Sequence, residues 1–368
     1  MIIVDYSSIM HRMLHASVHS TQPTLKENGK YDTTLFIADV QMYIIQELSM
    51  IKDKFSNKYG EIYLAFDNKD SKYWRCDIYP QYKLNRSSLK DESLIDFDEF
   101  YTHMDDFNDM LMVDSPLPSL SVLRCEADDI ILVLAYLLGK KEKVLIYSPD
   151  KDFIQEQSED NLVTQYSSKV KAFIDVTTKN KDMQEWLLEH VCLGDTTDNV
   201  PRVVDGTVFS PKFKEWCEEK GLAVLEPYEF YEKYGKENAT RIFEKFPFFK
   251  KNRKGEDTAV LDIFHKASFG AKTLFKQVEK AGSLDAWLDS HPMYRENYEL
   301  NYKLVMREGI PQDIEDAILD NYLNVDKSFN KNKVDTYLAS HGLSGSIVEF
   351  GTLFNNLKKP IDASFFDW

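Results

Sequence analysis

The residues of this chain that could do chemistry are acids placed where apolar runs begin or end. Glu126-Ala127-Asp128-Asp129 opens a helical apolar run over residues 130–138, and a β-type run over residues 143–147 leads into Asp150-Lys151-Asp152. The helix dipole stabilises carboxylates at a helix N-terminus, so capping alone accounts for the first group. In open α/β sheets, however, ligands gather at the carboxyl ends of strands. Acids that face one crevice repel one another and need cations between them, so this stretch indicates a metal site.

Two further strand-like runs end at an aspartate in the same way. Residues 1–4 precede Asp5, and residues 61–66 precede Asp67. Each run has the length of a buried parallel strand, and the chain between them is long enough for helical crossovers such as the amphipathic stretch 35–54. Turn formation or capping explains one aspartate at a strand end, but three in succession are harder to dismiss. The pattern predicts an α/β fold with a mainly parallel sheet.

A third acidic group follows a predicted helix over residues 183–192. In Gly194-Asp195-Thr196-Thr197-Asp198 two aspartates stand three residues apart. They form either a turn with Asx hydrogen bonds or the ligands of a second cation, and the sequence leaves both open. A strand pair over residues 161–166 and 170–176 precedes this helix.

Residues 69–90 combine basic and aromatic side chains. They hold six basic residues against two aspartates, interleaved with four aromatic ones: Lys69, Lys72, Arg75, Lys83, Arg86 and Lys90, with Tyr73, Trp74, Tyr79 and Tyr82. This composition suits contacts with the backbone and bases of a nucleic acid. The plainer alternative is a solvated loop that packs its aromatic rings on the domain edge. The next residues, 91–106, carry seven acids and no Lys or Arg, and continue as a helix that Pro116 and Pro118 end.

The length, composition and net charge of the chain limit the class of protein to which it can belong. The 368 residues are enough for two or three packed regions at about 150 residues each. The longest apolar run, residues 130–138, is too short to span a bilayer, and the N-terminus lacks the basic region of a signal peptide. Four scattered cysteines predict reduced thiols in a cytosolic protein. The net charge of −16 argues against a generally basic nucleic-acid binder, but not against one whose acids gather at metals.

The second half of the chain is less informative. Residues 202–266 alternate charges with aromatic rings and include a basic patch over residues 250–254. A glycine turn, with Gly270, Lys272 and Thr273, then leads into a predicted helix over residues 274–281. Backbone N–H groups at such a helix start can bind a phosphate. A simple helix-entry turn is the alternative.

Together these motifs resemble the 5′-nuclease (flap endonuclease) family. The resemblance is carried, in order, by Asp5, Asp67, Glu126-Ala127-Asp128-Asp129, Asp150-Lys151-Asp152 and Gly194-Asp195-Thr196-Thr197-Asp198-Asn199. Residues 67–86 and 294–314 look like the ribonuclease H branch of T-even-type bacteriophages in particular. The resemblance covers residues 1–200 well and is weaker over residues 266–345. One departure is Ser268, which stands where relatives have a glycine, and a second is the insertion 202–266.

The resemblance implies a PIN-like α/β core over residues 1–200, with an arch or clamp segment over residues 69–112. It also implies a DNA-binding helical region of helix–three-turn–helix type over residues 201–358. Two divalent metal ions belong to the family, the first held by Asp5, Asp67, Glu126, Asp128 and Asp150, the second by Asp152, Asp195 and Asp198, with Asp129 shared or supporting. Because no His or Cys stands at ligand spacing, Mg²⁺ is expected, with Mn²⁺ as a substitute.

The function implied by the resemblance is a metal-dependent 5′→3′ exonuclease and flap endonuclease that removes RNA primers and 5′ flaps during DNA replication. Its substrates would be flapped, nicked or RNA-primed duplex DNA, and it would act as a monomer in the cytoplasm, that of the host if the protein is from a phage. Lys83 and Arg86 would reach the scissile phosphate from the arch. Further nucleic-acid contacts are expected from Arg75, Tyr82, Gly270, Lys272 and Thr273.

The last ten residues, 359–368, form a separate segment with three large aromatic side chains, Phe365, Phe366 and Trp368. We expect this tail either to bind a replication partner, a sliding clamp above all, or to fold back on the chain's own helices. A single-stranded DNA-binding protein is a further expected partner. Two other functions stay open from sequence: a PIN-type endoribonuclease that cuts single-stranded RNA, and a non-catalytic nucleic-acid-binding protein.

Overall fold

The computed structural model describes residues 1–179, 181–204, 207–225, 227–246, 248–251, 257–260, 263–266, 269–347 and 351. The chain forms two compact units. The first unit comprises Met1–Val200 and the chain from Glu299 onward, and the second comprises Pro201–Tyr298. The predicted helical region 201–358 is therefore divided between the two units. The tail 359–368 and Ser268 lie outside the described residues.

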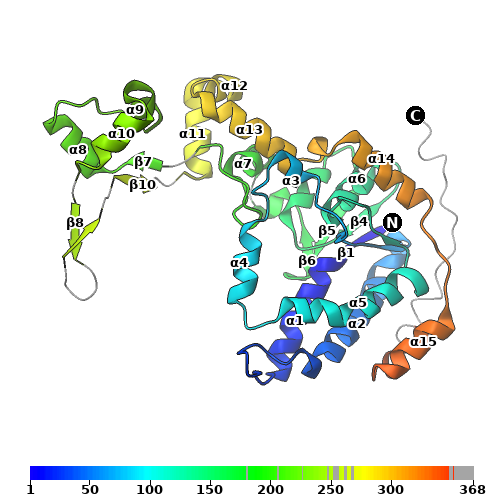
Figure 1. The fold of residues 1–368 in the computed structure, drawn as a ribbon. Coiled ribbons are helices and arrows are strands. Elements are labelled where there is room, and N and C mark those ends of the chain that lie inside the picture. Colours follow the sequence, from blue (N-terminus) through cyan, green and yellow to red (C-terminus); the bar gives the residue numbers. More distant parts are fainter. Residues whose placement is uncertain are drawn as a thin grey trace. The chain divides into compact units, whose positions relative to one another are not determined.

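The first unit is built on a six-stranded sheet in the order β3-β2-β1-β4-β5-β6 (Figure 1). The first five strands in the chain are parallel, and the last runs antiparallel to its neighbour. The predicted mainly parallel sheet is confirmed. A two-residue strand carries no periodic signal, so the sequence did not predict β3. The strands are β1 (Ile2–Asp5), β2 (Ile62–Ala65), β3 (Ser119–Leu120), β4 (Val144–Tyr147), β5 (Val163–Ser167) and β6 (Ala172–Ile174).

Helices connect and cover these strands. One helix, α13 (Pro292–Val305), passes from the second unit into the first. The other α-helices of the first unit are α1 (Tyr6–Thr21), α2 (Ile37–Tyr59), α3 (Arg75–Ile78), α4 (Asn85–Glu92), α5 (Phe97–Asp109), α6 (Ala127–Gly139), α7 (Met183–Leu193), α14 (Gln312–Leu323) and α15 (Lys331–Ser340). Shorter helical turns are η1 (Thr33–Leu35), η2 (Met110–Asp114), η3 (Lys151–Glu156), η4 (Val176–Lys179) and η5 (Arg307–Gly309).

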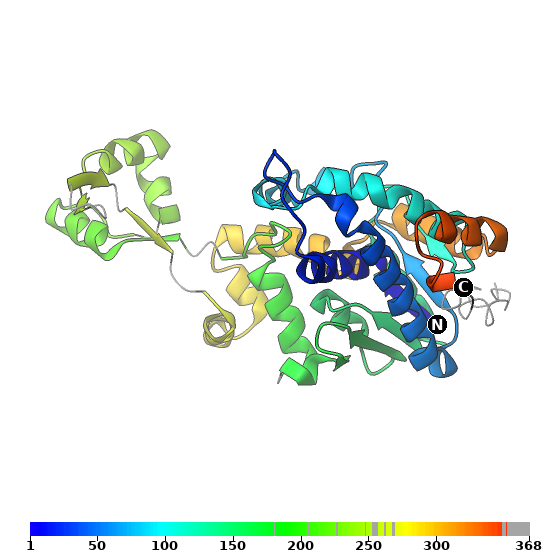
Figure 2. The ribbon, with the colours of Figure 1, turned by 90° about the horizontal axis from the view of Figure 1, so that it is seen from below.

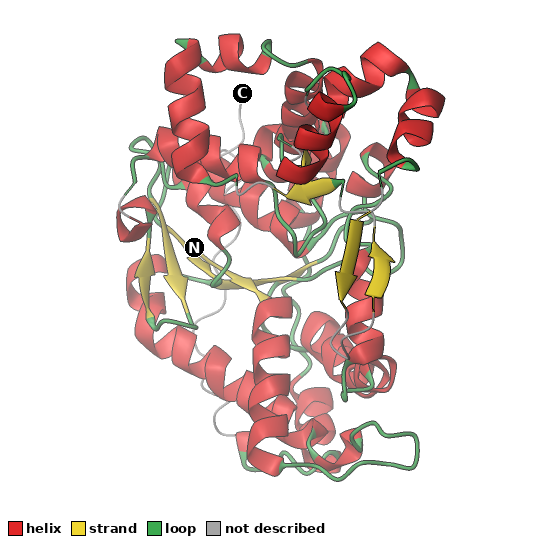
Figure 3. Ribbon diagram, turned by 90° about the vertical axis from the view of Figure 1, so that its left-hand side faces the viewer, coloured by secondary structure: helices red, strands yellow, loops and turns green. Residues whose placement is uncertain are grey.

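The two faces of the sheet bury separate hydrophobic clusters. Successive residues of a strand point to opposite faces, so Ile2 and Val4 pack with α1, α2 and α5, whereas Ile3 packs with α6 and α14. On the first face α1 and α2 lie side by side (Figure 2). Figure 3 shows helices on both sides of the sheet. This layering leaves the strand ends, rather than the sheet faces, open to a ligand.

The chain returns to the first unit because its late helices carry apolar stripes that fit the two clusters. In α14 the residues Ile314, Ile318 and Tyr322, spaced four apart, are buried in the cluster that contains α6. In α15 the residues Val334 and Leu338 are buried in the cluster of α1 and α2. Four-residue spacing places side chains on one helix face. The helices α14 and α15 are thus part of the packing of the first unit.

The second unit has a hydrophobic core of its own. Phe209, Phe213, Phe230 and Phe243 are buried together, with ring centroids 4.7 to 5.9 Å apart. The predicted insertion 202–266 therefore contains a packed subdomain. Elements of this unit are β7 (Thr207–Phe209), α8 (Pro211–Glu219), α9 (Pro227–Tyr234), α10 (Lys236–Phe243), β8 (Phe248–Lys251), β9 (Asp257–Val260), β10 (Phe264–Lys266), α11 (Ala271–Ala281) and α12 (Leu284–Leu288).

No helix in the described part of the chain combines the length and apolar character that crossing a membrane requires.

Candidate active site

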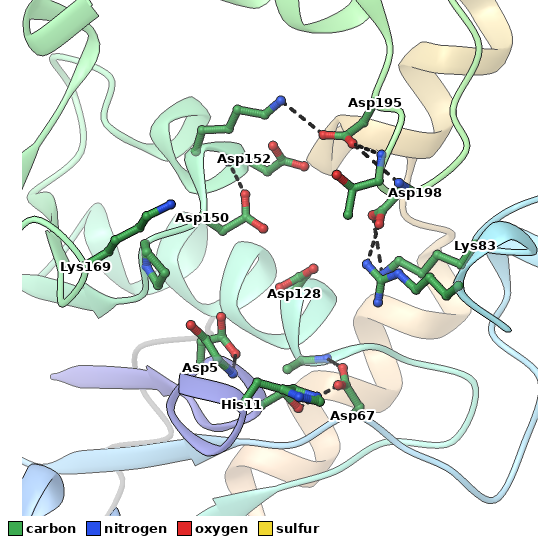
Figure 4. A pocket seen from close by; sticks show the side chains of 17 residues that line it. Asp5, His11, Asp67, Lys83, Asp128, Asp150, Asp152, Lys169, Asp195 and Asp198 are labelled. Carbon is green, nitrogen blue, oxygen red and sulfur yellow. Dashed lines mark hydrogen bonds and ion pairs between the residues drawn. The ribbon is translucent and has the colours of Figure 1, made fainter. Parts of the chain in front are cut away.

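The acids predicted from strand ends meet in one pocket of the first unit. Asp5 is the last residue of β1, while Asp67 and Asp150 follow β2 and β4, the two neighbours of β1 in the sheet. Parallel strands therefore bring the three carboxyl groups to one edge. The pocket has a volume of about 510 Å³, and its lining includes seven aspartates, labelled in Figure 4: Asp5, Asp67, Asp128, Asp150, Asp152, Asp195 and Asp198.

Several of these aspartates also cap a helix or turn. Asp5 Oδ1 accepts a hydrogen bond from Ser8 N at 2.9 Å at the start of α1. Asp150 Oδ1 accepts one from Asp152 N at 3.0 Å at the start of η3. Asp195 Oδ1 accepts one from Thr197 N at 2.7 Å. Capping and a role in a site are therefore compatible, because each carboxylate keeps a second oxygen for another partner.

Other side chains that the sequence analysis did not single out hold these acids in place. Ser7 Oγ donates to Asp67 Oδ2 at 2.6 Å, and Ser148 Oγ donates to Asp5 Oδ2 at 2.7 Å. His11 also lines the pocket, one helical turn after Ser7. Strand-end position is a signal that would have found Ser148, and the helical spacing from Ser7 would have found His11.

The buried carboxyl groups hold their protons unusually tightly. Burial raises the pKa of Asp5 to about 7, and the charges of Asp67 and Asp150 act in the same direction. Burial and the neighbouring Asp152 raise the pKa of Asp150 to about 7. The pKa of Asp152 is raised by burial to about 6, and that of Asp128 lies well above its usual range. Cations in the pocket would relieve this repulsion.

Two basic residues also line the pocket: Lys83, between α3 and α4, which faces the acids in Figure 4, and Arg86, in the first turn of α4. Lys83 Nζ lies 3.4 Å from Asp198 Oδ2 and also pairs with Glu126, and Arg86 pairs with Asp198. The backbone of Lys83 donates from its N–H to Asp198 O at 2.9 Å. The base of the predicted arch is thereby fixed to the turn that carries Asp198.

The sequence of the first unit matches a known family. Residues 1–195 match the model of the family described as 5′-3′ exonuclease, N-terminal resolvase-like domain. This chain belongs to that family. The predicted membership of the 5′-nucleases is therefore confirmed, and the residues that line the pocket lie within the match except Thr197 and Asp198.

Two relatives of this 5′-nuclease have names that also describe nucleases. The chain is 29% identical to the ribonuclease H of Enterobacteria phage T4 over 171 residues, 45% of this chain and 55% of the relative. It is 31% identical to a 5′-3′ exonuclease of Buchnera aphidicola over 162 residues, 42% of this chain and 53% of the relative. The chain thus spans about half the length of these relatives.

A solved structure of T5 5′-exonuclease with bound zinc ions is also similar in fold. The similarity covers 88% of this chain and 98% of that chain, with 16% identity and a TM-score of 0.46. A likeness at this level does not extend to individual side chains.

The donor set of this 5′-nuclease pocket fits hard divalent cations. All seven acids are aspartates, and carboxylate oxygen is the donor that Mg²⁺ and Mn²⁺ prefer. Asp152 Oδ1 is buried and has no hydrogen-bond partner in the described part of the chain. Among the described residues, no three His, Cys, Asp or Glu side chains form a preformed metal-binding group. The pocket therefore presents oxygen donors around a space, not a finished coordination shell.

Two of the nine predicted metal ligands do not line the pocket. Glu126 and Asp129 are 2% and 0% exposed, and both pair with the Arg75 guanidinium, at 3.1 and 2.7 Å. Tyr82 OH donates to Glu126 Oε2 at 2.9 Å. Asp129 Oδ2 accepts from Glu126 N at 2.9 Å, which closes a capping box at the start of α6. These two acids fix the start of the helix that carries Asp128, and Glu126 also pairs with Lys83, which lines the pocket.

Arg75 and Tyr82, which the sequence predicted to contact nucleic acid, are buried, and their contact with nucleic acid stays a prediction. Arg75 is 3% exposed and Tyr82 is 7% exposed. Arg75 Nε donates to Leu304 O at 2.7 Å, so its donors are satisfied inside the protein. A basic and aromatic composition gives no signal that separates such a buried network from a binding surface.

The predicted phosphate-binding turn lies in the second unit. Gly270 is the N-cap of α11 and has no side chain to bond the first turn, and its carbonyl accepts from Thr273 N at 2.9 Å. Lys272 is in the first turn of the same helix. The contact of this turn with nucleic acid stays a prediction.

Proposed function

We propose that the protein is a metal-dependent 5′→3′ exonuclease and flap endonuclease that removes RNA primers and 5′ flaps during DNA replication. The observation that carries this proposal is the pocket in which aspartates from separate segments of the first 200 residues face Lys83 and Arg86. The family match and the names of the relatives support it.

The proposed cofactor is a pair of Mg²⁺ ions, for which Mn²⁺ can substitute. Asp5, Asp67, Asp128 and Asp150 would hold the first ion, and Asp152, Asp195 and Asp198 would hold the second. Such a pair activates water and neutralises the leaving oxygen of a phosphodiester. Every donor in this set comes from a side chain that lines the pocket.

The chain's own cations would bind and orient the phosphate. Lys83 and Arg86 pair with Glu126 and Asp198, so a substrate phosphate would compete with these carboxylates for the same N–H donors. Lys83 is largely shielded from solvent, with a side chain that is 13% exposed. Charge is most effective where water is excluded, so the two side chains are suited to stabilise charge that develops on the phosphate.

The proposed substrates are flapped, nicked and RNA-primed DNA duplexes. We also propose that the protein acts as a monomer in the cytoplasm. Its proposed partners are a sliding clamp and a single-stranded DNA-binding protein. The aromatic tail that would bind the clamp lies outside the described residues.

The test is digestion of 5′-labelled flap, nicked and RNA-primed duplexes with Mg²⁺, with EDTA as the negative control. We expect the parent protein to cut all three, and Asp150→Asn to bind them without cutting. Asp160→Asn is the matched control, because Asp160 is exposed and outside the pocket. Cleavage by Asp150→Asn at the parent rate would contradict the assignment. Preferential cutting of single-stranded RNA would favour the PIN-type endoribonuclease instead.

A further inference from the structure

Four lysine and arginine side chains line the acidic pocket, and they differ in whether their charge is already paired. Lys83, Arg86 and Lys151 each pair with a carboxylate; for Lys151 the partner is Asp195, at 3.1 Å. Lys169 also lines the pocket, but it has no hydrogen-bonding or ion-pair partner among the described residues. It is the lining cation whose charge is available to a ligand without breaking an existing pair.

The position of Lys169 is fixed by the sheet. It lies in the turn that joins β5 to β6, at the carboxyl end of β5. Asp5, Asp67 and Asp150 lie at the carboxyl ends of the other parallel strands. Ser167 and Ser168, which precede it, are buried. Gln165 Nε2 of β5 donates to Ser148 O at 2.9 Å and also to the carbonyl of Asp150. The strand β5 that leads into the turn is therefore hydrogen-bonded to the loop that carries Asp150.

The cations stand on two sides of the carboxylates. Figure 4 shows Lys169 on the side of the pocket opposite Lys83, with Asp150 and Asp128 between them. A nucleic-acid strand that crosses the pocket carries a negative charge at every nucleotide. Seven aspartates repel those charges, and Lys83 and Arg86 on one side and Lys169 on the other would offset the repulsion on the two sides of the cleavage point.

We propose that Lys169 binds a backbone phosphate next to the scissile phosphate, on the side of the pocket opposite Lys83 and Arg86. This inference rests on the proposed function and adds a substrate-binding residue to it. A lysine ammonium binds phosphate as a point charge and needs no planar geometry, which suits an exposed residue on a turn. The contact is electrostatic and independent of base sequence.

The experiment measures how the dissociation constant of a fluorescent 5′-flap DNA depends on salt. All proteins carry Asp150→Asn, so that the DNA is not cut during the titration. The variants are Lys169→Gln, Lys169→Arg and the control Lys171→Asn. Lys171 is in the same turn but is not among the residues that line the pocket. It has φ +55°, a conformation that asparagine tolerates.

The logarithm of the association constant falls linearly as the logarithm of the salt concentration rises. Loss of one phosphate contact makes this slope less steep, by about 0.7 on single-stranded and 0.9 on duplex DNA. We expect this decrease for Lys169→Gln, and the parent slope for Lys169→Arg and Lys171→Asn. An unchanged slope in Lys169→Gln would overturn the inference, and so would an equal decrease in Lys171→Asn, because the effect would then be general surface charge. If the protein with Asp150→Asn alone fails to bind the DNA, the proposed function fails as well.

Discussion

Replacing Arg75 by methionine is expected to destabilise the first unit strongly. The guanidinium is 3% exposed and pairs with Glu126 at 3.1 Å and Asp129 at 2.7 Å. Methionine fills a similar space but leaves Asp129 without its cation and Glu126 with Lys83 alone. Removing one partner of a buried ion pair costs about 3–5 kcal/mol. This is a large share of the ~5–15 kcal/mol that holds a typical domain folded.

The measurement is the free energy of unfolding from urea titration, followed by circular dichroism and by tryptophan fluorescence. Trp74 contributes to this fluorescence, and its ring centroid lies 4.5 Å from Arg75 Cζ. The matched control is Arg124→Met, because Arg124 pairs with Asp77 at 2.5 Å but is exposed. The control is expected to unfold like the parent. Adding Asp129→Asn to Arg75→Met removes the unpaired negative charge of Asp129. The double variant is expected to regain part of the lost free energy of unfolding. If Arg75→Met is as stable as Arg124→Met, the buried network does not hold the acidic motif.

Three further outcomes follow from the structure. Lys83→Ala should lower the cleavage rate on flap DNA by about 10²–10³, the scale for removing one charge-stabilising group, while a rate within a few-fold of the parent would contradict its role. Burial raises the pKa of Glu156 to about 8, against the opposing charge of Arg307, so the folded protein keeps a proton that the unfolded chain has lost. The contribution of this proton to the free energy of unfolding is fully present below the unfolded pKa of about 4.5 and is lost as the pH rises through about 8. The melting temperature of Glu156→Gln should therefore rise relative to that of the parent between about pH 5 and pH 9. A constant difference between the two would refute this. Gly309→Ala should destabilise the protein, because the new Cβ would lie 2.3 Å from a backbone oxygen of residue 303, whereas Gly345→Ala meets nothing within 4 Å and should melt like the parent.

The sequence predicted the parallel strands and the acids that follow them because both depend on local patterns. A short apolar run with an acid at its end is sufficient to place Asp5, Asp67 and Asp150 at one edge once the strands are parallel. The packing of α14 and α15 against the sheet of the first unit was not predictable, because an apolar stripe on a helix does not identify the surface against which the helix packs. The burial of Arg75 depends on distant partners in the same way. Lys169 carries no sequence signal, since its relevance comes only from the strand that ends beside the pocket.

The aspartates that cap helices and turns determine how the pocket should be mutated. Alanine at Asp5 or Asp150 would remove the acceptor of a backbone N–H as well as the charge, so lost activity would mix misfolded local structure with lost chemistry. Asparagine keeps an oxygen acceptor in the same place and removes only the charge. An Asp→Asn and Asp→Ala pair at each position would therefore separate what each carboxylate contributes to assembling the backbone from what it contributes to the reaction.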